Sequence, residues 1–442
     1  MEAFRTLPRA RPEDQGMSSD KLEALRRAVR LTVDEGTKAE GFRPNALALV
    51  SRGGKIVFED IYGYADLEKK VPLRPDSIFR MASCTKPVVA VAVMICYERG
   101  CFQLDDALSS YLPEFSKMQV WAGGDAEHPQ LEPASQPITI RHLLTHTSGL
   151  QAAMHTPVAK EAAKVRDRIT FGGGRIKDLA EYCKRIAACP LIAQPGTTFS
   201  YANGPTVLGR CVELWSGRRL DVFMEEHIFG PLGMVDTGFK IPEAKLYRLV
   251  EMYSRSGQGD RLERTHVKSP SSGGMFTTRG GIYDGAGGLL STAADYFRFV
   301  QMLCSRGVGV NGARVLKAQT VELMSQNHLP GGGDIASCEY VLPTRRKGIP
   351  TAQFFIEEPR EGVGHGLGGP VVVDAAAAKL AANRGQYMGA GAFNCVFYVD
   401  FEDELAALWM TQLGPDLAVG RNTMRAAVAA SIVGRAGPAS RL

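Results

Sequence analysis

The sequence predicts an α/β (α+β) protein in which one antiparallel sheet is built from both chain ends and flanked by the terminal helices. Strand-like runs bounded by turn signals lie near both ends of the chain, at residues 45–52, 55–64, 366–374, 391–400 and 404–412. Helical periodicity dominates between these two sets. We therefore expect residues 1–104 and 285–442 to form a discontinuous sheet domain, and residues 105–284 to form an inserted, mainly helical domain.

The N-terminal part of the chain predicts a helix followed by a β-hairpin. Leucine and valine recur at the spacing of one helical face over residues 19–35, and Ser19 or Asp20 is expected to cap that helix. The two strands that follow are separated only by Gly53-Gly54, which is a two-residue turn signal.

The rest of the chain reads as helices and connections that lead to the C-terminal strands. We expect helices over residues 138–150, 176–188, 204–218, 295–305, 317–326 and 418–434. Proline and glycine make residues 194–204 loop-like. Residues 241–284 are polar and rich in glycine and serine, which predicts a long surface loop of the size that often forms lids or substrate walls.

Composition excludes several classes of function. Charged residues make up 22% of the chain and the net charge is +5, with no basic block beyond Arg345-Arg346-Lys347, so neither nucleic acid nor an anionic membrane is an expected partner. We expect neither a secretory signal nor a transmembrane segment, because the first residues contain no apolar run and no other window is apolar enough to span a membrane. Its nine scattered cysteines form neither a C-x-x-C motif nor a Cys/His metal cluster. We expect a cytoplasmic protein with reduced thiols and without a metal or cofactor.

A candidate nucleophile lies at the start of the most apolar helix. Ser83 and Lys86 precede the run from Val88 to Cys96, and Pro87 is tolerable only near the first turn of a helix. Side chains three residues apart share a helical face, so the hydroxyl and the amine should be neighbours. A serine becomes nucleophilic when a base takes its proton, and a lysine beside it can do so or assist another group.

The same Ser-x-x-Lys spacing occurs at Ser18 and Lys21, where the surroundings indicate a helix cap instead of a site. The spacing alone is therefore weak evidence for a catalytic serine, and the assignment of Ser83 depends on the other candidate residues.

Two further segments complete a candidate site. Tyr201 belongs to the sequence Tyr201-Ala202-Asn203 in a loop, where its phenol could act as general base for Ser83 while the amide of Asn203 orients the substrate. The small residues Gly389, Ala390, Gly391 and Ala392 would let a backbone amide approach the reacting carbonyl. Together with the amide of Ser83, that amide would form an oxyanion hole.

Other motifs are better explained by structure. His365 lies in a formal G-x-G-x-x-G, but a strand and not a helix is expected after it, so a dinucleotide site is disfavoured. His142 and His146 are expected to pack or to form hydrogen bonds. Neither G-x-S-x-G nor H-E-x-x-H occurs, which disfavours an α/β-hydrolase and a zinc hydrolase.

With these residues in place, the chain resembles the serine β-lactamase/penicillin-binding-protein superfamily, and within it the family VIII carboxylesterases. The resemblance covers nearly the whole chain. Its segments include residues 12–18, 141–150, 229–234, 287–296 and 409–412. It implies a class C β-lactamase-like fold, with the active site between the two domains.

The resemblance also implies a role for each candidate residue. Ser83 resembles the acylated nucleophile, Lys86 its proton-transfer partner and Tyr201 the general base. Gly389-Ala390-Gly391 stands where the β-lactamases have Lys-Thr-Gly and the esterases often have Trp-Gly-Gly, which would make the amide of Ala392 the second oxyanion donor. This departure removes a cationic anchor for a β-lactam carboxylate and, with no tryptophan, predicts a wider pocket.

The resemblance leaves several functions open. The first hypothesis is a serine esterase that hydrolyses a small-molecule ester. The second is an acyltransferase in which an alcohol or amine replaces water, to which the wider pocket and the 241–284 loop would be suited. A β-lactamase or peptidase, and a catalytically dead binding protein, are the weaker alternatives. Assembly into a homo-oligomer stays open.

Overall fold

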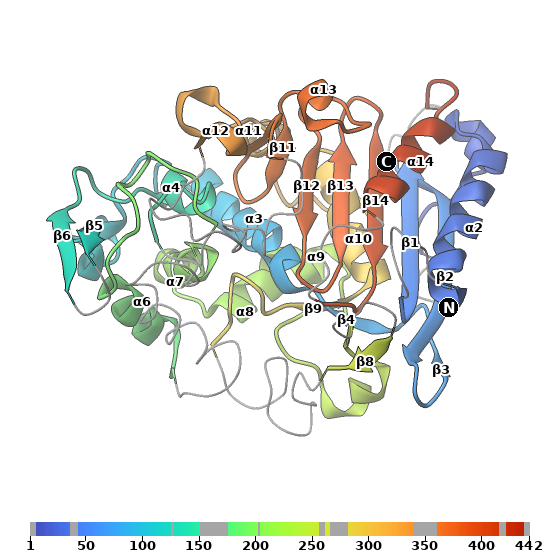
Figure 1. Ribbon diagram of the computed structural model, residues 1–442, viewed down its shortest axis with the longest axis horizontal. Coiled ribbons are helices and arrows are strands. Elements are labelled where there is room, and N and C mark those ends of the chain that lie inside the picture. Colours follow the sequence, from blue (N-terminus) through green and yellow to red (C-terminus); the bar gives the residue numbers. More distant parts are fainter. Residues whose placement is uncertain are drawn as a thin grey trace.

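An antiparallel sheet made from both ends of the chain organises the computed structural model (Figure 1). The structure describes residues 6–35, 43–124, 128–150, 176–201, 204–255, 261–265, 282–338, 360–414 and 421–436, the side chains of 421–423 excepted.

Within these residues the sheet has eight strands in the order β10-β11-β12-β13-β14-β1-β2-β3. From the N-terminal end come β1 (Asn45–Arg52), β2 (Lys55–Asp66) and β3 (Val71–Pro72). From the C-terminal end come β10 (Val363–His365), β11 (Pro370–Val372), β12 (Tyr387–Ala390), β13 (Val396–Asp400) and β14 (Leu405–Met410). The junction is the pairing of β1 with β14, from Leu47 opposite Met410 to Arg52 opposite Leu405. The predicted sheet from both termini is thereby confirmed.

Alternating side chains give the sheet two buried faces, because successive residues of a strand point to opposite sides. On one face, Leu47 and Leu49 of β1 belong to the core of α3 (Thr85–Glu98) and α10 (Ala293–Cys304). On the other, Ala46 and Ala48 pack with α2 (Ser19–Asp34) and α14 (Arg421–Ser431). The sheet is thus sandwiched between a central helix pair and the terminal helices.

The predicted helices are present, with ends shifted by a few residues. The middle of the chain holds α4 (Ile140–Leu144), α6 (Leu179–Ala187), α7 (Gly204–Ser216), α8 (Leu220–Met224) and α9 (Gly230–Leu232). Further on are α11 (Ala318–Met324), α12 (Ile335–Cys338) and α13 (Ala375–Ala378). The cap of α2 is Ser18, whose hydroxyl accepts the amide of Lys21 at 3.4 Å, one residue before the expected cap. The second Ser-x-x-Lys is therefore a helix cap.

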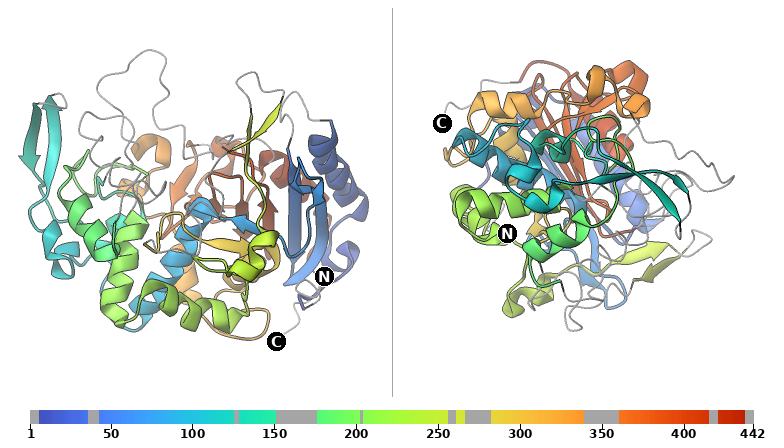
Figure 2. Two further views of the ribbon diagram at one scale, coloured as in Figure 1. Left: turned by 90° about the horizontal axis from the view of Figure 1, so that it is seen from below. Right: turned by 90° about the vertical axis from the view of Figure 1, so that its left-hand side faces the viewer.

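The middle of the chain also contains strands that the sequence reading missed. A ribbon of β5 (Gln119–Gly124) and β6 (Pro129–Pro133) projects at the end of the molecule opposite to α2 (Figure 2). The described part of the predicted 241–284 loop contains a short 3₁₀ helix and the ribbon of β7 (Tyr253–Arg255) with β8 (Leu262–Arg264). The division into two domains stays a prediction.

Two C-terminal strands differ from expectation. Of the expected strand at 366–374 only β11 is a strand; residues 366–369 form the turn that joins it to β10, where Gly368 adopts φ +89° and an added Cβ would lie 2.2 Å from the side chain of Ala90 in α3. The expected strand at 391–400 begins only at Val396, since the chain turns after β12. No helix in the described parts of the chain is long and apolar enough to cross a membrane.

Candidate active site

Ser83 lies in a single 3₁₀ turn, η2 (Ala82–Cys84), between β4 (Ile78–Arg80) and α3. The predicted helix therefore starts as a tight turn and becomes an α-helix at Thr85. Ala82, directly before the serine, adopts a left-handed φ of 46°, a conformation that costs energy for any residue with a Cβ. The hydroxyl of Thr85 donates to Ala82 O at 2.7 Å and helps to hold this turn. Ser83 itself is half-buried.

Lys86 reaches back to Ser83 from the first turn of α3. Its Nζ donates to Ser83 Oγ at 3.0 Å and to the carbonyl of Ala286 at 2.6 Å. The side chain is buried, with 6% of the residue exposed. The predicted neighbourhood of hydroxyl and amine is present in the structure.

Tyr201 lies beside the same ammonium group. Lys86 Nζ stands 4.6 Å from the centroid of the Tyr201 ring, a cation–π contact. The structure thus brings Tyr201, which is distant in the sequence, to the ammonium group that also contacts Ser83. Asn203, the predicted substrate contact, lies outside the described residues.

Two buried histidines extend this cluster. The ring of His146 lies 4.6 Å from the Tyr201 ring and 5.2 Å from the His365 ring, centroid to centroid. The carbonyl of His146 also accepts the amide of Ser200 at 2.7 Å, so it holds the chain directly before Tyr201. His142 instead closes a capping box with Thr139 at the start of α4, the hydrogen-bonding role expected of it.

Both histidines of the cluster are held neutral. Burial lowers the pKa of His146 well below its ordinary value, and His365 and Lys86 nearby lower it further. Burial lowers the pKa of His365 to about 4, although its hydrogen bond to Gly366 O opposes the shift. Because a carbonyl can only accept, His365 Nδ1 carries the proton in this 2.8 Å bond. The sequence did not predict that either histidine lies at the site. The only features that could have indicated it are the segment His146-Thr147-Ser148-Gly149 and the glycine-rich segment around His365.

The turn after β12 approaches Ser83 closely. A Cβ on Gly391 would lie 2.3 Å from the carbonyl oxygen of Met81, so only glycine fits here. The thiol of Cys84 donates to Cys395 O at 3.1 Å and ties the end of this turn to η2.

Inside the turn, Gly391 N–H donates to Cys395 O at 2.7 Å, whereas the amide of Ala392 has no acceptor among the described residues. Gly391 thus lies beside the nucleophile's turn, and the role of the Ala392 amide as second oxyanion donor stays a prediction.

Gly389 differs from its expected role. A Cβ at this position would lie 2.3 Å from the Phe397 ring, its cross-strand partner. The space left by the missing side chain is therefore filled by Phe397 on the α10 side of the sheet. A side chain at 389 would point at Phe397 in the core, so the small residue there is no evidence for a wider pocket.

The site's surroundings are thiol-rich but contain no recognisable metal centre. All nine cysteines are free, and Cys84 and Cys395 are fully buried. Among the described residues, no group of three or more His, Cys, Asp or Glu side chains could hold a metal ion.

The fold and this cluster agree with the family to which the sequence belongs. The sequence model of the family described as Beta-lactamase matches residues 25–430. The chain belongs to the beta-lactamase family, which confirms the resemblance and the class of fold.

Relatives of known name include both esterases and acyltransferases. Esterase EstB of Burkholderia gladioli is 37% identical over 231 residues, which cover 51% of this chain and 55% of EstB. Acyltransferase calJ of Penicillium decumbens is 27% identical over 365 residues, which cover 82% of each chain.

The solved structure of simvastatin synthase (LovD) from Aspergillus terreus superimposes with a TM-score of 0.74 at 24% identity, and the match covers 93% of this chain and 99% of that one. This likeness concerns the fold. The protein is thus a member of a serine hydrolase family with esterase and acyltransferase relatives.

Proposed function

We propose that this protein is a serine hydrolase that cleaves carboxylic esters of small molecules through an acyl-enzyme on Ser83. The observation that carries the proposal is the 3.0 Å hydrogen bond between Lys86 Nζ and Ser83 Oγ, with Tyr201 against the same ammonium group. The similarity to esterase EstB over half of the chain supports the choice of an ester as substrate.

The proposed reaction uses these groups in order. Ser83 Oγ attacks the ester carbonyl while its proton passes to the oxygen of Tyr201, which acts as base in the phenolate form next to the Lys86 ammonium group. The carbonyl oxygen becomes negative and is held by the amides of Ser83 and Ala392. The proton passes to the leaving alcohol as the tetrahedral intermediate collapses. Water then attacks the acyl group by the same route and releases the acid and free Ser83.

An acyltransferase is the second candidate, because calJ matches over 82% of this chain. In that reaction an alcohol or amine would take the place of water at the acyl-enzyme. One argument for it is lost, since the side chain missing at Gly389 would point at Phe397 in the core.

The test is turnover of p-nitrophenyl butyrate together with intact-mass measurement. We expect the wild type to release p-nitrophenol and Ser83→Ala to lose at least about 10³-fold in rate. Ser18→Ala is the matched control, because Ser18 has the same spacing to a lysine but caps α2; it should keep full activity.

The outcome also separates hydrolysis from transfer. A wild-type adduct on Ser83 that persists in water and clears on addition of an alcohol or amine would favour the acyltransferase. Folded wild type without turnover and without an adduct would refute both.

A further inference from the structure

A turn at residues 284–288 touches the nucleophile's element directly. The carbonyl of Ala286 accepts Lys86 Nζ at 2.6 Å. Next to it, Leu289 donates its amide to Thr85 Oγ1 at 3.0 Å and accepts the amide of Met81 at 2.9 Å. This turn is therefore attached to the chain on both sides of Ser83, and among the described residues its carbonyl and Ser83 Oγ accept the Lys86 ammonium group.

Asp284 builds that turn. Its carbonyl accepts the amides of Gly287 and Gly288 at 3.2 and 2.8 Å, and its carboxylate oxygen Oδ1 accepts the amide of Ala286 at 3.0 Å. An aspartate that bonds to a backbone amide two residues onward fixes the orientation of the intervening peptides. The side chain of Asp284 thus fixes the peptides that lead to Ala286, and its main-chain carbonyl holds the next peptide, whose oxygen, Ala286 O, accepts Lys86 Nζ.

The same carboxylate oxygen also binds a second element, the helix α7. Thr206 Oγ1, in the first turn of α7, donates to Asp284 Oδ1 at 2.6 Å. The two segments are in close contact, because a Cβ on Gly285 would lie 2.4 Å from the carbonyl oxygen of Pro205. Since α7 begins at Gly204, this helix directly follows the segment that carries Tyr201.

We propose that Asp284 is a positioning residue, which fixes Lys86 relative to Tyr201 by tying the 284–288 turn to α7. The inference rests on the proposed function of Ser83, Lys86 and Tyr201 and adds to it the group that sets their spacing. Hydrogen bonds to a carboxylate are shorter and stronger than those between neutral groups, so one oxygen can hold two elements. Without it, the peptides that lead to Ala286 lose their side-chain anchor and their bond to α7, which would let the Ala286 carbonyl shift away from Lys86.

Variants with graded loss of the two bonds test the proposal. Asp284→Ala removes both, and we expect kcat for p-nitrophenyl butyrate to fall about 100-fold with KM changed less than about 3-fold. Asp284→Asn keeps an oxygen acceptor of the same shape and should recover most of that loss. In α7, Thr206→Val should lower kcat about 10-fold, whereas Thr206→Ser, which keeps the hydroxyl donor, should not.

Crystal structures of the variants provide a readout that does not require turnover. We expect Ala286 O to leave hydrogen-bonding distance of Lys86 Nζ in Asp284→Ala and to keep it in Asp284→Asn. An unchanged contact in Asp284→Ala, or wild-type kcat in that folded variant, would overturn the proposal. A wild type that forms no Ser83 adduct would instead refute the proposed function, and the structural comparison would still decide the role of Asp284.

Discussion

At the scale of single residues, the site depends on two imidazoles that carry no charge. His146 and His365 are each 2% exposed; the ring of His146 contacts the Tyr201 ring, the ring of His365 contacts that of His146, and the charge of Lys86 acts on both. A protonated imidazole here would be a buried charge and would repel Lys86. The neutral state of both rings leaves Lys86 as the positive charge that touches Tyr201 and Ser83.

The burial of these imidazoles predicts how stability depends on pH. In the unfolded chain a histidine binds its proton near pH 6.5, whereas folded His365 does so only near pH 4. Between pH 4 and pH 6.5 the unfolded state therefore binds more protons than the folded state. The stability that the neutral His365 provides is complete above pH 6.5 and is lost as the pH falls. For each pH unit of acidification in this interval, each such histidine lowers the free energy of unfolding by up to about 1.4 kcal/mol.

Urea denaturation at pH 7, 6 and 5 measures this effect. We expect His365→Gln to lose less stability than the wild type over this interval, because glutamine does not titrate. Equal pH dependence for the two proteins would show that His365 does not contribute.

Replacing Lys86 should lower activity without lowering the stability of the fold. A buried ammonium group costs desolvation energy, and Lys86 is 6% exposed. We expect Lys86→Met, which keeps the length of the side chain, to lower kcat/KM by about 10² to 10⁴-fold. Its melting temperature should equal or exceed that of the wild type. A melting temperature well below the wild type would mean that Lys86 has a structural role, and full activity would exclude it from proton transfer.

At the scale of elements, the end of β12 shows why two neighbouring glycines serve different purposes. Gly389 makes room for the Phe397 ring inside the core, and Gly391 makes room for the Met81 carbonyl beside Ser83. Sequence alone places both in one small-residue segment and cannot separate them, because the distinction depends on which neighbour faces each residue.

This difference predicts opposite responses to a second substitution. Gly389→Ala and Gly391→Ala should each destabilise the fold by about 1 to 3 kcal/mol, as overpacking does. Phe397→Leu should restore stability to Gly389→Ala, since a flexible side chain is the obstacle there. It should not restore Gly391→Ala, where the obstacle is backbone and the displaced turn would also impair the reaction at Ser83. Thermal melts and p-nitrophenyl butyrate turnover of the four variants check this, and rescue of Gly391→Ala by Phe397→Leu would contradict it.

At the scale of the whole molecule, the sequence predicted what depends on local patterns. The strands of both termini, most helices and the proximity of Ser83 to Lys86 follow from periodicity, turn residues and helical spacing. The proximity of His146, His365 and Asp284 to the site depends on how α4, β10 and the 284–288 turn pack around α3, which no local pattern encodes. The β5–β6 ribbon was missed because its residues are mostly exposed and lack an alternating apolar pattern.

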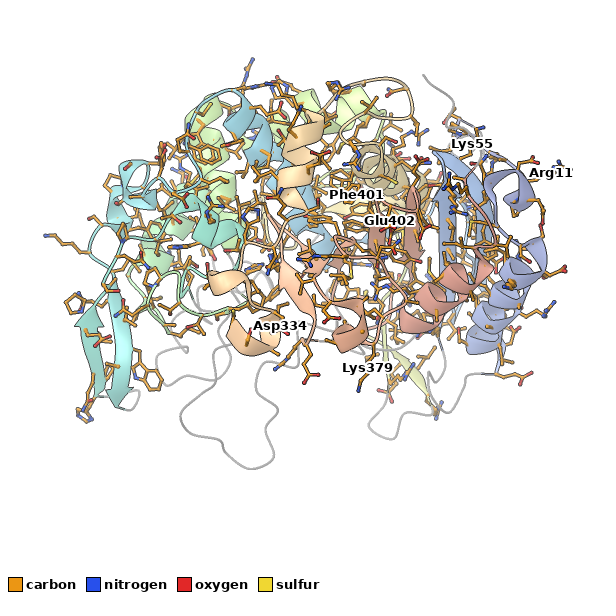
Figure 3. All side chains as sticks on the ribbon, turned by 90° about the horizontal axis from the view of Figure 1, so that it is seen from above. Arg11, Lys55, Asp334, Lys379, Phe401 and Glu402 are labelled. Atoms are coloured by element: carbon orange, nitrogen blue, oxygen red, sulfur yellow. The ribbon has the colours of Figure 1, made fainter. Side chains whose placement is uncertain are left out.

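The joining of the two termini has its own anchor in Arg52, at the end of β1. Its guanidinium donates to the carbonyls of Gln15, Gly16 and Gly434 and to both the carbonyl and the carboxylate of Asp403, at 2.7 to 3.2 Å. Asp403 lies in the β13–β14 turn, which Phe401 and Glu402 mark in Figure 3. One buried side chain, 3% exposed, thus connects the N-terminal segment, the C-terminal segment and the sheet.

Loss of this anchor should destabilise the whole fold while leaving the site's chemistry intact. Arg52→Met would leave several buried carbonyls without a donor, and we expect the free energy of unfolding to fall by about 3 kcal/mol. Arg52→Lys keeps the charge but not the planar fork, so it should recover only part of the loss. Arg11 is the matched control, because it lies at the outer edge of the molecule and pairs with the neighbouring Asp14 (Figure 3); Arg11→Ala should change the urea midpoint very little. The same midpoint for Arg52→Met and the wild type would show that the two chain ends are held together by the sheet alone.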